Sequence, residues 1–172
     1  MKHKLEHGPG YARAAAVSAL AAITDKTNYP FYTKVMCIAF GMLEHGDSEQ
    51  AVRDSVVRVC SSLALRGDQH VLALLFRVAH SQLPAARQAA VEMMRHVCHE
   101  RHPHTHSLLL FLLKDSDWGV RRMAALASAL LASPTDERIM QGLLLVLEDE
   151  ERYVREAATL ALSNLRRHQP VS

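Results

Sequence analysis

The chain has 172 residues, of which 49% are apolar and only 5% aromatic, and its formal net charge is +2. A charge so close to balance argues against non-specific nucleic-acid binding. The three cysteines (Cys37, Cys60 and Cys98) form no CxxC pair, which argues against a disulfide framework or a four-cysteine zinc site and favours a reducing compartment.

In chain order, the sequence predicts a single helix at 8–25 and then four helical hairpins at 30–65, 68–99, 103–132 and 136–167. Because Arg13 and Arg53 are 40 residues apart, we expect about six extra residues in the connection around 24–28. All prolines fall where helices are expected to begin or end, as proline disrupts a helix interior: Pro9, Pro30, Pro84, Pro103, Pro134 and Pro170. Gly41 and Gly142 fall inside predicted helices, and close approach of a neighbouring backbone is one explanation for them.

A 34-residue period runs through the four hairpins. A Val-Arg or Ala-Arg pair recurs at this interval. A turn residue and a small residue in each predicted second helix recur at the same interval. The series are Arg53, Arg87, Arg121 and Arg155, then Asp47, Ser81, Asp115 and Asp149, then Val56, Ala90, Ala124 and Ala158. The period predicts an all-α fold, an α-solenoid of about four and a half hairpins that forms one domain over 1–172.

The most regular units read Leu112-Leu113-x-Asp115-x-Asp117-x-x-Val120-Arg121-x-x-Ala124 and Leu147-x-Asp149-x-Glu151-x-x-Val154-Arg155-x-x-Ala158. This pattern resembles the HEAT-repeat family, in particular its short version in phycobilisome-lyase-like proteins. The resemblance covers nearly the whole chain. It implies a scaffold whose curved surface holds a protein or nucleic-acid partner, and it does not specify an activity.

The repeated arginines have two interpretations. They could form an anion-binding stripe, or they could link successive units by bridging turn carboxylates such as Asp115 and Asp149. A helical wheel directs Arg121 towards a neighbouring unit rather than open solvent, so we expect a structural ladder of Arg53, Arg87, Arg121 and Arg155.

The second-helix face opposite the core is the expected binding surface. If it is concave, it carries mixed charge in the first half of the chain and two exposed leucines in the second half. Isolated surface leucines are common and can be without function. The candidate binding residues are Arg58, Glu92, Arg95, Arg122, Leu126 and Leu160, and a peptide groove is expected around the last four.

Histidine and cysteine side chains crowd one connection, and Cys98 and His102 have the i, i+4 spacing of a possible metal pair. Pro103 interrupts the segment and its spacing matches no standard zinc motif, so we expect no metal, although the question stays open at this point. The segment contains His96, Cys98, His99, His102, His104 and His106.

Enzymatic alternatives find little support in the residues. Deoxyhypusine hydroxylase is similar in architecture and uses His-Glu pairs at the start of second helices, but the matching positions here include Arg122-Met123 and Glu156-Ala157. No glycine-rich phosphate loop and no catalytic triad is evident. The alternatives that remain are a bilin-lyase-like enzyme or enzyme subunit and a nucleic-acid-binding repeat protein.

We therefore expect a non-catalytic scaffold without a cofactor that binds a protein or peptide. The N-terminal stretch lacks the apolar core of a signal peptide, and no apolar run reaches the roughly 18 to 20 residues that cross a bilayer. These features predict a cytoplasmic protein without a membrane partner. The initial half-unit indicates either a truncated cap or a piece of a larger array.

Overall fold

The computed structural model describes residues 8–45, 49–99 and 103–167. In these ranges all regular structure is helical, and there is no strand. The chain divides into two compact units, Met1–Val97 and Cys98–Ser172. The helices are α2 (Gly10–Ala22), α3 (Tyr29–Glu44), α4 (Gln50–Leu63), α5 (Gln69–Ala79), α6 (Pro84–Val97), α7 (Pro103–Leu112), α8 (Trp118–Leu131), α9 (Glu137–Val146) and α10 (Arg152–Arg167).

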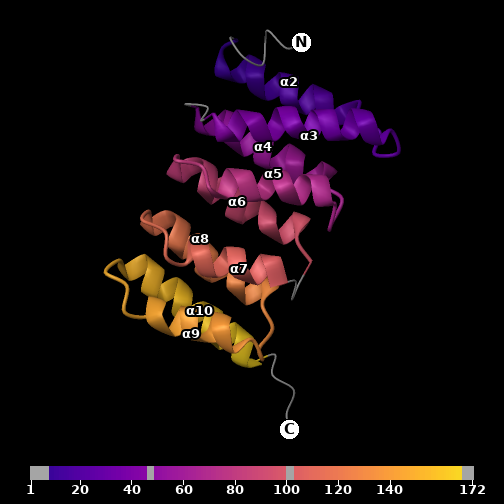
Figure 1. Cartoon of the computed structure of the whole chain (residues 1–172). Helices are drawn as coiled ribbons and strands as arrows, with labels where there is room; N and C mark the ends of the chain where they lie inside the picture. The colour runs from indigo at the N-terminus through magenta and orange to yellow at the C-terminus, as the bar shows by residue number, and fades with distance from the viewer. Residues whose placement is uncertain (1–7, 46–48, 100–102, 168–172) are drawn as a thin grey trace. The chain divides into compact units, whose positions relative to one another are not determined.

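The first unit has two layers of helices. Helices α2, α4 and α6 form one layer, in which α4 packs against both of the others. Helices α3 and α5 pack against each other in the second layer, and each also contacts its hairpin partner, α4 or α6. Figure 1 shows these helices lying side by side. The second helices of successive 34-residue units are therefore neighbours within this part of the chain.

The second unit repeats the same layering with two hairpins. Helix α8 packs against α10, and α7 packs against α9. Within the hairpins, α7 packs against α8 and α9 packs against α10, and these contacts hold the two layers together. The buried face of α8 holds Val120, Ala124 and Leu131, whose spacing places them on one side of the helix.

The repeated positions of the sequence occupy equivalent places in the core. The small residue of each second helix has no exposed surface, at Val56, Ala90, Ala124 and Ala158. The residue before each repeated arginine is also buried, at Val52, Ala86, Val120 and Val154. Small side chains at these positions allow the packed helices to approach closely, so the 34-residue period is a packing period.

Short polar side chains define where several helices begin. The carboxylates of Asp68 and Asp117 accept hydrogen bonds from the amides of Val71 and Val120, both at 3.0 Å. Asp136 accepts from two amides at the start of α9. These bonds satisfy N–H groups that have no partner inside the helix. Helices α5 and α9 begin directly after Asp68 and Asp136, where the predicted hairpins 68–99 and 136–167 start.

The extra residues of the first hairpin are not where the sequence analysis placed them. The connection from α2 to α3 spans only 23–28, whereas α3 has 16 residues and α5, α7 and α9 have 10 or 11. The prediction of a longer connection was therefore wrong, and the insertion lengthens a helix by more than one turn. Helix α3 accommodates it because its added turns continue to bury apolar residues, including Tyr32 and Val35.

The two helical glycines differ in their surroundings. A methyl group at Gly142 would lie 2.9 Å from Leu110 Cδ2 and 3.3 Å from Leu113 Cδ1, so the close approach of α7 to α9 accounts for this glycine. A methyl group at Gly41 would meet nothing within 4 Å. The expectation of a close backbone approach is thus wrong at Gly41, and at Gly142 the neighbouring atoms belong to leucine side chains and not to a backbone.

Candidate functional site

Three of the repeated arginines, Arg87, Arg121 and Arg155, share a contact with the turn before their own helix; the turn before the fourth, Arg53, includes residues 46–48, which lie outside the described residues. Arg121 Nη1 donates to the carbonyl oxygens of Asp115 and Ser116, at 3.0 and 3.2 Å. Arg87 and Arg155 donate in the same way to the carbonyls that lie six and five residues before them. Each arginine thereby satisfies carbonyls of the turn that precedes its own helix. The only sequence signal for this contact is the constant spacing between turn and arginine.

Arg121 also connects α8 to the turn that precedes α10. Its Nε donates to Asp149 Oδ2 at 2.7 Å and its Nη2 donates to Asp149 Oδ1 at 2.9 Å, so the pairing is bidentate. The side chains are only 11% and 9% exposed. The hydrogen bonds from Arg121 hold the pKa of Asp149 below its ordinary value, and the amide of Glu151 adds to this effect. At this position the arginine has a structural role.

A related bridge occurs at the start of the first unit, where sequence analysis found none. Arg13 Nη2 lies 3.4 Å from Glu49 Oε1, and the same oxygen accepts a hydrogen bond from the amide of Gly10 at 3.0 Å. Arg13 also donates to the carbonyl of Gly8. The bridge joins α2 to the residue before α4. The 34-residue period does not indicate this bridge, because Glu49 directly precedes its helix and lies outside the series of repeated turn residues.

In the first unit, the predicted binding residues are exposed on the second helices. Arg58 lies on α4, and Glu92 and Arg95 lie on α6, which packs beside it. Arg95 Nε donates to His96 Nε2 at 3.0 Å. Burial, together with the nearby cations Arg95 and Arg66, lowers the pKa of His96, so this imidazole is neutral at neutral pH and accepts the bond. The result is a mixed-charge surface on α4 and α6.

In the second unit, the structure separates the predicted residues. Arg122 is exposed and Leu126 half-buried on α8, while Leu160 is 49% exposed on α10. Leu160 lies in a shallow groove of about 380 Å³, but neither Arg122 nor Leu126 lines it. The groove runs along one helix and is lined by Arg152, Arg155, Glu156, Thr159, Leu160, Ser163 and Arg167. It therefore combines one apolar side chain with a cationic rim.

A second groove lies on the first unit, on a surface that sequence analysis did not consider. It has a volume of about 750 Å³ and is lined by Phe76, Leu83 and His80, among other residues. On its border Arg77 Nε forms an ion pair with Glu44 Oε2 at 2.8 Å. The residues come from the ends of α3 and α5 and from the turn before α6, and no periodic pattern on the second helices could have indicated them.

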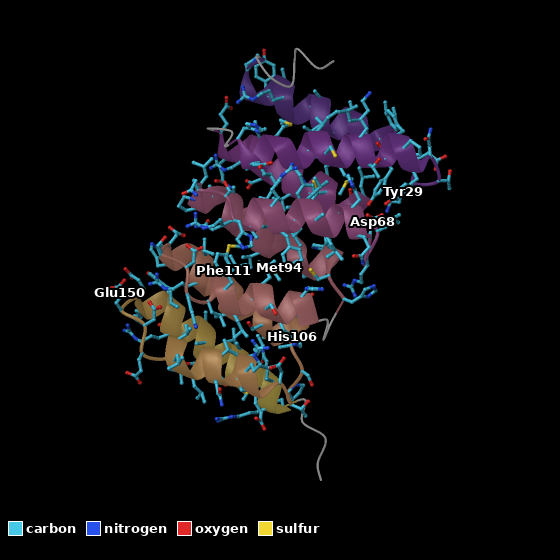
Figure 2. All side chains as sticks on the ribbon, in the orientation of Figure 1. Tyr29, Asp68, Met94, His106, Phe111 and Glu150 are labelled. Atoms are coloured by element: carbon cyan, nitrogen blue, oxygen red, sulfur yellow. The ribbon has the colours of Figure 1, made fainter. Side chains whose placement is uncertain are left out.

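In the histidine-rich connection, His106 makes partly buried polar contacts. His106 Nδ1 is paired with Asp136 Oδ2, and its Nε2 lies 3.4 Å from the carbonyl oxygen of Leu131. Among the described residues, no three His, Cys, Asp or Glu side chains are placed to hold a metal ion. His102, which the i, i+4 argument needs, lies outside the described residues. Both ring nitrogens of His106 thus face protein atoms of its own unit, near the other end of that unit from Glu150 (Figure 2).

Two aromatic pairs lie at helix starts. The rings of Trp118 and Tyr153 have centroids 6.0 Å apart and join the first turns of α8 and α10, although both side chains remain about half exposed. In the first unit Tyr29 and Tyr32 form a similar pair at 5.8 Å. Figure 2 shows Tyr29 beside Asp68, whose carboxylate hydrogen-bonds to the phenol and raises its pKa. The Trp118–Tyr153 contact joins two helices, whereas the Tyr29–Tyr32 contact lies within α3.

No protein-family model matches the chain, and no curated protein matches it. In the part of the chain that the structure describes, no helix has the length and apolar character that crossing a bilayer requires.

Proposed function

We propose that this protein is a non-catalytic scaffold, an α-solenoid of HEAT-like units that holds a protein or peptide on the exposed face of its second helices. The packing within each of the two compact units supports such an array. In the first, α4 lies between α2 and α6, and in the second, α8 lies against α10. The ion pairs Arg13–Glu49 and Arg121–Asp149 each join one helix of this layer to the residues just before the next helix of the layer. A regular array leaves one face of each second helix free for a partner.

The groove on α10 is the observation that carries this proposal. Leu160 is half exposed there and is flanked by the guanidinium groups of Arg152, Arg155 and Arg167. An apolar contact surrounded by a polar rim is the usual composition of a protein-recognition site. A peptide that covers Leu160 would remove its exposed surface from water while the arginines fix the orientation of the chain.

The cysteines support a cytoplasmic location for this scaffold. No disulfide joins Cys37, Cys60 and Cys98, and Cys37 is exposed. Exposed free thiols persist where the environment is reducing.

A paired set of variants tests the proposal. Leu126→Glu combined with Leu160→Glu places two charges on the second-helix face, and Leu145→Glu, at a site 71% exposed on α9, is the matched control on the first-helix face. Tagged proteins would capture partners from a lysate of the source cells, with quantification by mass spectrometry and circular dichroism to verify folding. We expect specific partners to be lost only with the double variant. Unchanged capture by a folded double variant would exclude the second-helix face.

A further inference from the structure

We propose that the groove on α10 binds an acidic segment of a protein partner and that Arg155 chelates one carboxylate of that segment, as Arg121 chelates Asp149 within the chain. This inference rests on the proposed function and names the chemistry of the partner. It comes from comparing two arginines that occupy the same position in successive units.

Arg121 shows what each edge of such a guanidinium does. Its Nη1 is held by the carbonyl oxygens of its own turn, at 3.0 and 3.2 Å. Its other edge, Nε with Nη2, donates to both oxygens of Asp149. One edge therefore anchors the group, and the opposite edge receives a carboxylate from the turn that precedes the next second helix.

Arg155 has the first of these contacts without the second. Its Nη1 donates to the carbonyls of Asp149 and Glu150 at 2.6 and 2.8 Å, so the guanidinium is anchored as in Arg121. Among the residues that the structure describes, none accepts a hydrogen bond from Nε or Nη2 of Arg155. The edge that holds Asp149 in the preceding unit is thus available in the groove.

Because its Nη1 is held by the turn carbonyls, the guanidinium of Arg155 should bind a carboxylate more tightly than a mobile surface arginine does. Binding a carboxylate usually requires ordering a long side chain, which costs conformational entropy. At Arg155 the two turn carbonyls already restrict the guanidinium. A carboxylate can then accept two parallel hydrogen bonds from the planar group, an arrangement that lysine cannot provide.

The charges of the groove favour an acidic ligand. Three arginines and one glutamate line it, and that glutamate is already paired, because Arg152 Nε donates to Glu156 Oε1 at 2.7 Å. Arg155 and Arg167 therefore lack an acidic partner within the lining. A segment with two or more carboxylates complements this rim.

Leu160 and two hydroxyl groups indicate which kind of residue lies beside the carboxylate in the ligand. The hydroxyls of Thr159 and Ser163 each donate to a carbonyl one turn earlier, both at 2.9 Å, which leaves their oxygens able to accept hydrogen bonds from a ligand. Leu160 offers apolar surface beside them. The structure therefore points to a peptide in which an apolar residue lies next to Asp or Glu, as in the chain's own segment 145–151, Leu-Val-Leu-Glu-Asp-Glu-Glu.

The probe for the test is that segment as a fluorescein-labelled peptide, LVLEDEE, compared with its uncharged counterpart LVLQNQQ. Fluorescence anisotropy of the full chain at low and moderate salt measures binding. We expect LVLEDEE to bind about tenfold more tightly than LVLQNQQ, because each bidentate contact to a charged group contributes on the order of one decade or more.

Two groups of variants locate the contact. Arg155→Lys preserves the charge and removes the bidentate geometry, and we expect it to weaken LVLEDEE binding about tenfold. Arg167→Glu reverses a charge on the rim without disturbing the Arg155 anchor, and its matched control is Arg166→Glu, the neighbouring exposed arginine outside the groove. We expect the first to weaken binding about fivefold more than the second.

Each other outcome overturns the inference. Equal binding of both peptides, or equal effects of Arg167→Glu and Arg166→Glu, would exclude carboxylate recognition in the groove. Tighter binding of a single-stranded oligonucleotide of equal charge would assign the arginines to phosphates, and a dimer that Arg155→Lys abolishes in sedimentation would make the occupant a second copy. If these tests fail while the Leu126/Leu160 double variant still loses its partners, the proposed function stands without this inference.

Discussion

Arg121, on α8, and Asp149, in the turn before α10, make two parallel hydrogen bonds, at 2.7 and 2.9 Å, with both side chains almost fully buried. The guanidinium is simultaneously bound to the carbonyls of its own turn. One side chain therefore fixes a turn and joins two units. The pair occupies a position that the 34-residue period repeats, so its energetics bear on how the units are held together.

The Arg121–Asp149 pair should show strong energetic coupling. We expect Arg121→Ala and Asp149→Ala each to lower the free energy of unfolding by about 2 kcal/mol, since each leaves a buried charged group without its partner. A double-mutant cycle from urea denaturation should give a coupling energy above about 1 kcal/mol. The control is Arg152 and Glu156, also 2.7 Å apart but 79% and 53% exposed, for which coupling should stay below about 0.5 kcal/mol. Equal coupling in the two cycles would refute this role.

Acid should weaken the fold through the same pair. Arg121 lowers the pKa of Asp149 in the folded state, whereas the unfolded chain has the ordinary value of 3.8. The unfolded state therefore binds more protons as the pH falls through 3.8, so stability is lost from there down through the folded pKa. Urea denaturation between pH 2 and 6 should show a shallower acid decline for Asp149→Asn than for the unmodified protein. Identical slopes would contradict the assignment.

The thiols should differ sharply in reactivity. Burial raises the pKa of Cys60 to about 12, and Cys98 is also buried, whereas Cys37 is exposed. Since the thiolate is the reactive form, a chromogenic disulfide reagent at pH 8 should label one thiol rapidly and the other two only after denaturation. Cys37→Ser should remove the rapid phase. A second rapidly labelled thiol in that variant would indicate that the core around Cys60 or Cys98 opens readily.

Replacing the two helical glycines by alanine should affect the stability of the protein differently. Gly41→Ala adds a methyl group in open space and should stabilise the protein by about 0.5 to 1 kcal/mol through helix propensity. At Gly142 the same methyl group would press against Leu110 and Leu113, which offsets that gain. Thermal and urea denaturation should therefore rank Gly41→Ala above Gly142→Ala by at least about 0.5 kcal/mol. The reverse order would show that α7 and α9 separate easily.

The helices could be predicted from sequence because several independent signals agree at each of them. Pro134 follows the end of α8, the 34-residue period places Val120 and Ala124 in its hairpin, and both of these residues are buried. The length of α3 could not be predicted, because an insertion of about six residues fits a longer helix as well as a longer loop. The tolerance of Gly41 depends on the space around it, which no local pattern reports.

Only part of the candidate site could be derived in the same way. Periodicity indicated that Leu160 is exposed, and it is. The groove around it also depends on Arg155 and Arg167, and the first of these was assigned to a structural ladder. The same residue type has different surroundings in successive units: Asp149 lies against Arg121, while the corresponding edge of Arg155 faces the groove. Such a difference depends on which elements are neighbours in space, and the repeat pattern makes the positions look equivalent.

A continuous array of 34-residue units is the claim on which the scaffold proposal depends. Residual dipolar couplings of the backbone amides in α4, α6, α8 and α10 measure it most directly, because they report the orientation of all four helices in one frame. We predict that a single alignment tensor fits the four helices, with a similar rotation from each to the next. Two independent tensors for the segments before and after residue 97, or an irregular rotation between α6 and α8, would contradict it.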